Sequence, residues 1–506
     1  MNEKATEVVD NVTYFRGVRY GSCDQRFGPC YLKSLDDGSF LNDTRAFPQS
    51  VYNSKIWSTK EIYHTEDAFT MDIWVPNEAW ESQSLLPIIF WIYGGGFQEG
   101  SNYLEIYNCL RLASRARCLI VAPNYRVSLF GFLHLPEFSI NGNMGLEDQV
   151  IALEWIKTNI EKFHGNPDNI TLMGNSAGSA SISWHVQHSQ TLINNAFMIS
   201  GHLDCRWACE SGGKSKEKSE KLLNSMQGEN REEKFKQLLS LPCKLLLDCS
   251  NEIMDNTRNP LAFAWLPWTS SGILDYQQLS PHIKIFFGFF PYEILYFIPI
   301  FCQDNYENYV ERFLGSPPFS VDEKEVKSTH AMYKDQDYFS CFTDKTSSMI
   351  MPRREHEEIS LLSDITFNIP LLRSMKNISD STENLVHGIV FDMKPVHWMR
   401  KKDDVPITES DSASVKSYKN GLLGTHADDV PYLFQLDLNC QESRVADKLA
   451  SLVEAITWNK TGDHWIRFHA STQFNLIKLD SSGQISQISA GKFVKRILSQ
   501  DNSFKC

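Results

Sequence analysis

The chain has 506 residues, of which 42% are hydrophobic, and a formal net charge of -13 at pH 7. This length and apolar content can bury a large core, whereas the acidic balance argues against a nucleic-acid surface, because phosphate contacts need clustered Lys and Arg. Twelve cysteines are too few for a disulfide scaffold of this length, and they lack the paired CxxC spacing of zinc sites, so no metal is indicated.

The chain shows no linker, internal repeat or low-complexity block, which predicts a single domain over residues 1–506 with long insertions. Residues 1–10 lack the apolar run of a secretory signal, so we expect a cytoplasmic protein, or a secreted one if the N-terminus is truncated. The most apolar segment, 285–301, is broken by Pro291, Glu293 and Pro299. It is too short for a membrane span, and we expect a buried helix or a pocket wall.

In the first part of the chain, apolar runs predict strands. Residues 8–21 and 69–75 alternate as strands do, and 88–93 is apolar throughout, as in a strand buried on both faces. This run ends in Gly-Gly-Gly-Phe at 94–97, and a second apolar strand is expected at 119–123. A glycine triplet directly after a buried strand leaves backbone N–H groups open to a ligand, as an oxyanion site requires.

A helix is expected over 144–163, from apolar residues spaced by three and four, followed by a buried strand over 169–173. The next five residues, 174–178, read Gly-Asn-Ser-Ala-Gly, and small residues then begin a helix. A GxSxG sequence between a strand and a helix predicts a strained turn that lifts the serine hydroxyl above the sheet. Ser176 is therefore the candidate nucleophile; the alternative is a chance GxSxG in a loop.

The remaining elements are less regular. Residues 211–233 are charged and polar and predict a solvated helical insertion. Between 320 and 420 the apolar stretches are short and indicate only mixed helix and strand content. From residue 443 onward, apolar residues at helical spacing predict a late helix.

Several blocks resemble the type-B carboxylesterases and cholinesterases. In order they are residues 91–97 (WIYGGGF), 124–127 (NYRV), 142–149 (GNMGLEDQ), 165–169 (GNPDN) and the GxSxG turn. The similarity extends from Phe-Arg-Gly-Val at 15–18 to Trp-Asn-Lys-Thr-Gly-Asp at 458–463. It implies an α/β-hydrolase fold: a central, mostly parallel sheet flanked by helices, with long insertions.

The resemblance also implies a triad in the chain order Ser, acid, His. Among 14 histidines, His426 stands in a block, 424–434 (GTHADDVPYLF), similar to the family's histidine loop, which makes it the expected general base. In 299–308 (PIFCQDNYEN), Glu307 matches the family's carboxylate, although Cys302 and Asn308 replace usual glycines and Asp304 is a rival.

Further implied residues concern the oxyanion and the acyl group. The expected oxyanion donors are the backbone N–H groups of Gly95, Gly96 and Ala177. Phe263 and Trp265 resemble acyl-pocket aromatics, and bulky rings there would favour short acyl groups; core packing is the alternative.

Two departures from the family pattern stand out. Asn175 replaces a usual acidic residue before the nucleophile, which removes a charge that could favour cationic intermediates. Ala68 replaces one cysteine of a family disulfide, and 47–50 lacks the other, which fits a reducing compartment.

Together these features predict a serine carboxylic-ester hydrolase that works through an acyl-enzyme on small, uncharged or weakly polar esters. No cofactor is expected, and neither is a nucleic-acid partner or a membrane span; the sequence leaves the oligomeric state open. Two alternatives remain: a catalytically weak or inactive binding and adhesion protein, and an acyltransferase that uses the same acyl-enzyme.

Overall fold

The structure is a computed structural model that describes most of the chain. The described residues are 4–50, 62–82, 84–253, 259, 261–270, 276–297, 313, 319, 353–396, 416, 420, 422–434, 438–460, 465–468 and 475–489.

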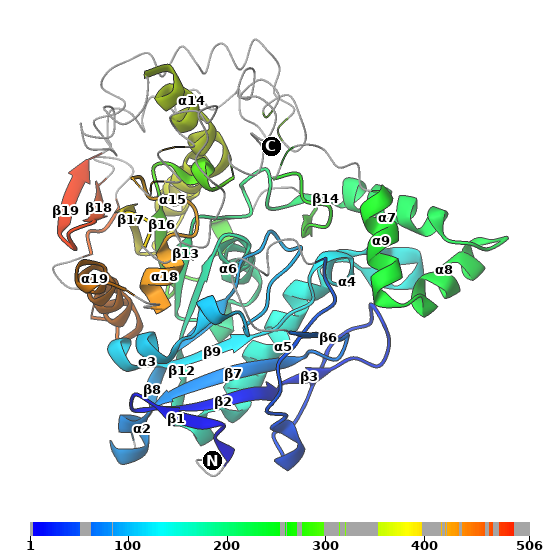
Figure 1. The fold of residues 1–506 in the computed structure, drawn as a ribbon, viewed down its shortest axis with the longest axis horizontal. Coiled ribbons are helices and arrows are strands. Elements are labelled where there is room, and N and C mark those ends of the chain that lie inside the picture. Colours follow the sequence, from blue (N-terminus) through cyan, green and yellow to red (C-terminus); the bar gives the residue numbers. More distant parts are fainter. Residues whose placement is uncertain are drawn as a thin grey trace.

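A central sheet of eleven strands runs through the molecule in the order β1-β2-β7-β9-β8-β12-β13-β16-β17-β18-β19 (Figure 1). The strands are β1 (Glu7–Val9), β2 (Val12–Arg19), β7 (Thr70–Pro76), β8 (Leu86–Ile92), β9 (Leu119–Pro123), β12 (Gly165–Asn175), β13 (Asn195–Ile199), β16 (Lys284–Phe289), β17 (Val386–Asp392), β18 (Asn475–Asp480) and β19 (Ile485–Ser489). From β9 to β18 every neighbouring pair is parallel, and the pairs at both ends are antiparallel. This is the predicted mostly parallel α/β sheet, with the predicted antiparallel start.

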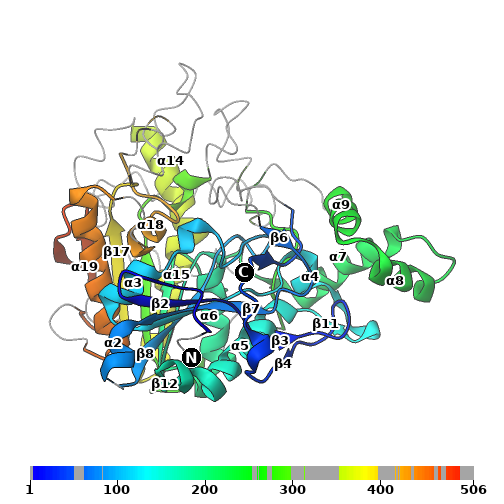
Figure 2. The same ribbon diagram turned by 60° about the horizontal axis from the view of Figure 1, so that its bottom comes forward.

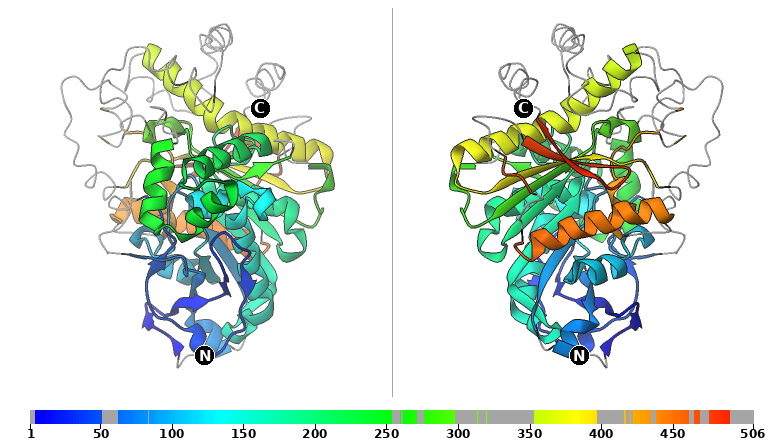
Figure 3. Two further views of the ribbon diagram at one scale, coloured as in Figure 1. Left: turned by 90° about the vertical axis from the view of Figure 1, so that its right-hand side faces the viewer. Right: turned by 90° about the vertical axis from the view of Figure 1, so that its left-hand side faces the viewer.

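Helices cover both faces of the sheet, because its strands are apolar on both sides. One core cluster joins alternate strand residues to α5 (Met144–Asn159), α6 (Ala177–His188) and α15 (Ile369–Ser381). The other joins the opposite residues to α3 (Leu110–Ala116), α18 (Asp429–Phe434) and α19 (Cys440–Thr457). Figure 3 shows α15 and α19 on opposite sides of the strands. The helices predicted near 144–163 and after 443 are confirmed as α5 and α19.

Three helices form an insertion that projects from the body of the molecule, to the right in Figures 1 and 2. They are α7 (Gly212–Ser225), α8 (Arg231–Ser240) and α9 (Cys243–Ile253). Ser211 and Asn230 cap the first two helices through their side chains. The predicted helical insertion is therefore confirmed, although it extends beyond residue 233.

The apolar segment 285–301 was expected to be a buried helix or a pocket wall, and its described part is not a long helix. Its first residues form β16, a central strand of the sheet, and Glu293–Tyr296 form a short 3-10 turn, η8, at the carboxyl end of that strand. The run of Ile and Phe reflects burial on both faces of a parallel strand, which periodicity alone does not separate from a buried helix. Within the described residues, no helix is long and apolar enough to span a membrane.

Candidate active site

The candidate nucleophile lies in a sharp turn between β12 and α6. Ser176 has φ 57° and ψ -124°, a backbone conformation that L-residues rarely adopt. Its N–H donates to Ile199 O at 2.9 Å. A Cβ added to Gly174 or Gly178 would lie 2.6 or 2.0 Å from Ile92 O, so both glycines are required for the turn to pack against β8. The predicted strand–turn–helix geometry is thus present.

The glycine loop follows β8 and packs against this turn. A Cβ on Gly94 would lie 3.1 Å from the Ser176 Cβ. Gly95 and Gly96 both have positive φ, 115° and 61°. In the part of the chain that the structure describes, the N–H groups of Gly95, Gly96 and Ala177 donate to no acceptor. They are available as donors to an oxyanion.

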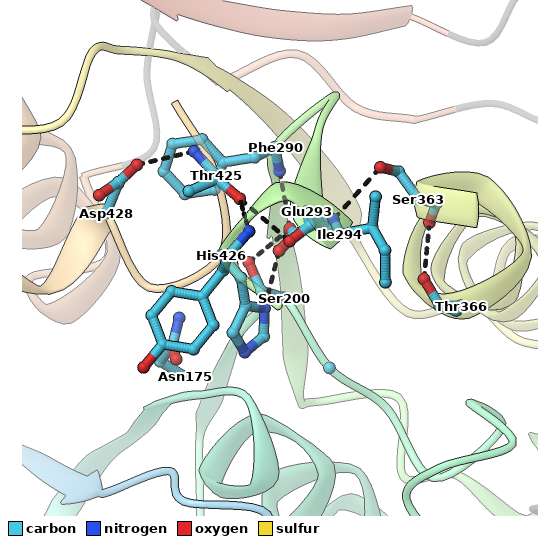
Figure 4. A network of polar contacts seen from close by, with 12 residues as sticks. Asn175, Ser200, Phe290, Glu293, Ile294, Ser363, Thr366, Thr425, His426 and Asp428 are labelled. Carbon is cyan, nitrogen blue, oxygen red and sulfur yellow. Dashed lines mark hydrogen bonds and ion pairs between the residues drawn. The ribbon is translucent and has the colours of Figure 1, made fainter. Parts of the chain in front are cut away.

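His426 contacts a carboxylate, that of Glu293. The Nδ1 of His426 lies 2.8 Å from Glu293 Oε2, and both side chains are buried (Figure 4). The other carboxylate oxygen, Oε1, accepts from the Ser200 hydroxyl at 2.6 Å and from the Phe290 N–H at 2.8 Å. A carboxylate on Nδ1 directs the imidazole and leaves Nε2 as the basic nitrogen.

The histidine loop is anchored on the turn that carries Glu293. The Thr425 hydroxyl donates to the carbonyl oxygens of Tyr292 and Glu293 at 2.9 and 3.0 Å, and it accepts from the Tyr296 N–H at 2.8 Å. The Thr425 N–H donates to Asp428 Oδ2 at 2.7 Å (Figure 4). The imidazole and its carboxylate are therefore held by backbone as well as by their own contact.

A further bond connects the end of β12 to α18. Asn175 Nδ2, one residue before Ser176, donates to Asp429 Oδ1 at 2.8 Å. Since Asp429 is three residues after His426, this contact brings the nucleophile turn and the histidine loop together. No described residue hydrogen-bonds the half-buried Ser176 hydroxyl itself. A Ser176–His426 proton relay therefore stays a prediction.

Aromatic rings surround the imidazole and the glycine loop. The rings of Phe367, Phe297 and Tyr296 lie 4.8, 5.1 and 5.8 Å from the His426 ring, centroid to centroid. Trp207 lies 5.5 Å from Phe367 and 6.0 Å from Phe263. Phe367 belongs to η10 (Asp364–Asn368), a π-helical turn, a feature frequent at functional sites.

The two predicted acyl-pocket aromatics differ in their positions. Phe263 packs on the glycine loop, because a Cβ on Gly96 would lie 2.5 Å from its ring. Trp265 is fully buried in the core, where its indole N–H donates to Ser250 Oγ at 2.8 Å. Phe263 thus lies at the candidate site, whereas Trp265 packs in the core next to it.

Glu307 and its rival Asp304 lie outside the described residues. The carboxylate beside His426 is instead that of Glu293, which in the sequence is only an interruption of an apolar segment. The signal in the sequence for this role was a charged residue within the most apolar stretch. A carboxylate buried there needs hydrogen-bond or ion-pair partners. Among the described residues, no group of His, Cys, Asp and Glu could hold a metal ion.

Comparison with known proteins identifies the family. The model of the carboxylesterase family matches residues 2–476. The chain belongs to the carboxylesterase family. This finding confirms the family resemblance, and the sheet agrees with the α/β-hydrolase fold expected of such a carboxylesterase-family chain.

Curated relatives match parts of this carboxylesterase-family chain. Acetylcholinesterase 4 of Caenorhabditis briggsae is 42% identical over 179 residues, which are 34% of this chain and 29% of that protein. Bile salt-activated lipase of Bos taurus is 42% identical over 218 residues, 42% of this chain and 36% of the lipase. Acetylcholinesterase of Myxine glutinosa is 40% identical over 141 residues, which are 28% of this chain and 42% of that protein. The chain thus spans less than half the length of each of these relatives.

Proposed function

We propose that this carboxylesterase-family chain is a serine hydrolase of carboxylic esters. The single observation that carries the proposal is the His426–Glu293 contact of 2.8 Å, joined through the Asn175–Asp429 bond to a strained turn that presents Ser176. The relatives' names, two acetylcholinesterases and a lipase, agree with ester substrates.

In the proposed reaction the Ser176 oxygen attacks the ester carbonyl carbon while its proton passes to Nε2 of His426. The carbonyl π electrons move to the oxygen, which accepts hydrogen bonds from the N–H groups of Gly95, Gly96 and Ala177. The C–O bond to the alcohol then breaks, and the imidazolium returns its proton to the leaving oxygen. Water hydrolyses the acyl-enzyme by the same steps in reverse order.

We assign the acid of the triad to Glu293 in place of Glu307. Its carboxylate keeps the Nδ1 proton on the ring and stabilises the imidazolium that forms during attack. The bonds from Ser200 and Phe290 hold the other oxygen, so that Oε2 stays directed at the ring.

The aromatic rings support short acyl groups as substrates. Phe263, Trp207 and Phe367 form a row from Gly96 to His426, with each ring contacting the next. An acyl chain bound between the oxyanion donors and His426 meets these rings within a few carbons. The proposed substrates are therefore small, uncharged or weakly polar esters.

The test is covalent labelling and turnover. An organophosphonate probe should label Ser176 in folded protein, and a short p-nitrophenyl ester should be hydrolysed. Ser176→Ala should abolish both, while Ser181→Ala, which removes a buried hydroxyl within α6, should keep both. Failure of the folded wild-type chain to label or turn over would favour the binding-protein alternative. An acyl-enzyme that reacts faster with an added alcohol than with water would indicate an acyltransferase.

A further inference from the structure

A second buried carboxyl group lies beside the His426–Glu293 pair. Asp429 begins α18, and its side chain is fully buried. Its Oδ1 accepts the hydrogen bond of Asn175, but no described residue donates to its Oδ2, which is also buried. Glu293 accepts three hydrogen bonds from Ser200, Phe290 and His426, so the two neighbouring carboxyl groups are held very differently.

Among the described residues, the groups that interact with Asp429 provide no cation beside it. Glu293 from η8 and Tyr107, a buried phenol from η3 (Glu105–Tyr107), interact with it electrostatically. Of the helices packed against α18, α3 and α19 direct charged residues such as Arg115 and Asp447 to the surface, where these two pair at 3.4 Å. His426 has its own carboxylate partner in Glu293.

An ionised Asp429 would be costly in this environment. A buried carboxylate that has no counter-charge loses its hydration without an ion pair to offset the loss. Burial raises the pKa of Asp429 well above its usual value, and the negative charge of Glu293 raises that pKa further, while hydrogen bonds from its own N–H and from Asn175 offset only part of the rise. When two carboxyl groups lie close together, such environments keep one ionised and the other neutral.

We propose that Asn175 and Asp429 form a neutral positioning pair that holds the nucleophile turn to the histidine loop, with Asp429 in its protonated form. The inference rests on the proposed function. The amide of Asn175 donates to the carbonyl oxygen of the acid without adding a charge, and the proton of the acid is on Oδ2. The imidazole then keeps the charge of its partner Glu293 without a second charge from Asp429. The pair therefore offers no attraction for a cationic substrate group.

The kinetic test compares pH profiles and rescue. Asn175→Ala should lower kcat about tenfold to a hundredfold with little change in KM, because the turn is no longer held. Asn195→Ala, which removes another buried amide at the start of β13, should leave kcat near wild type.

Asp429→Ala should lower kcat by a similar factor. Asp429→Asn should keep most of the wild-type kcat, and the acid limb of its pH profile of kcat/KM should lie at the same pH as that of the wild type. A shift of that limb by about one pH unit would show that Asp429 is ionised. An Asn175→Ala enzyme that behaves like Asn195→Ala would overturn the positioning role.

A second test needs no activity, and so separates this inference from the proposed function. At about pH 8, the infrared spectrum of the folded wild-type chain should contain a protonated-carboxyl band that Asp429→Asn removes. Asp72→Asn is the matched control, because Asp72 is also fully buried, with a pKa that burial raises to about 7, and should keep the band. A wild-type spectrum without the band would overturn the neutral form, whether or not the chain hydrolyses esters.

Discussion

Three donors hold the carboxylate of Glu293, and only one of them is the imidazole. The side chain thus keeps its position when His426 moves or changes protonation. Glu293→Gln should therefore leave the geometry nearly intact while removing the charge that stabilises the imidazolium. We expect a fall in kcat of about a thousandfold to ten-thousandfold, as for the loss of a triad carboxylate. Ester hydrolysis under saturating substrate measures it.

The matched variant for this prediction is Glu307→Gln, at the carboxylate that the family pattern indicated. It should hydrolyse the same ester at nearly the wild-type rate. If Glu307→Gln is the inactive variant and Glu293→Gln is active, the assignment from the structure is wrong and the one from the sequence is right.

Removing the Ser200 hydroxyl tests how much a second donor contributes to holding the Glu293 carboxylate. Its hydroxyl is buried and donates to Glu293 Oε1 at 2.6 Å, and its φ of 55° directs it from the end of β13 toward η8. Ser200→Ala should lower kcat about tenfold, since a hydrogen bond to a charged group contributes roughly 1.5 to 3 kcal/mol and two donors remain. Ser183→Ala, also buried on the neighbouring helix, should leave kcat unaffected. An unchanged kcat for Ser200→Ala would show that Phe290 and His426 suffice to hold the carboxylate.

The glycine loop and the Phe263 ring fill adjacent space beside the candidate oxyanion donors. Gly96 has φ 61°, and a Cβ there would lie 2.5 Å from the Phe263 ring. Phe263→Ala should therefore open space beside the oxyanion donors and raise kcat/KM for longer acyl chains relative to acetyl, by about tenfold for a few added methylenes. Rates across a p-nitrophenyl acyl series measure the change. Trp265→Phe, a substitution in the core, should leave the acyl preference as it is in the wild type.

The elements near the nucleophile could be predicted because their signals are local. A buried strand, the residues Gly174 to Gly178 and a helix follow one another directly, and β8, β9 and α5 have equally plain apolar patterns. Glu293 could not be assigned in this way, since its partner His426 is 133 residues away and the family pattern pointed to a later carboxylate. The helix that was one of the two expectations for 285–301 was wrong, because burial of β16 on both faces removes the alternation that identifies a strand.

A buried ion pair joins the N-terminal loops to the helices on one face of the sheet. Arg126 and Asp148 form a bidentate ion pair, with nitrogen–oxygen distances of 2.8 and 2.7 Å. Arg126 also donates to Gly28 O at 2.7 Å. Asp148→Asn should destabilise the fold by about 3 to 5 kcal/mol, because it leaves a buried guanidinium without its counter-charge. Urea denaturation measures it, and Asp67→Asn, which weakens the ion pairs of an exposed carboxylate with Arg19 and Arg45, should cost no more than about 1 kcal/mol. Equal losses in the two variants would contradict the prediction.

Buried neutral histidines should make the whole fold sensitive to acid. The His185 ring is fully buried between Gln149 Oε1 at 2.8 Å and Ser189 Oγ at 3.0 Å, and burial lowers its pKa to about 3. His356 is also buried, bonded to the Tyr292 hydroxyl at 2.7 Å, and its pKa falls to about 4. The unfolded chain binds these protons from about pH 6.5 downward, whereas the folded chain does not.

The stabilising contribution of each ring is therefore complete above about pH 6.5 and decreases as the pH falls toward the folded-state pKa, by about 1.4 kcal/mol per pH unit. The melting temperature should drop between pH 7 and pH 5, on the order of several degrees for such a change in free energy. His185→Gln cannot take up a proton, and so its melting temperature should change less between these pH values than that of the wild type. The exposed His64→Gln should change as much as the wild type. If His185→Gln and the wild type respond equally to acid, this ring does not determine the acid sensitivity.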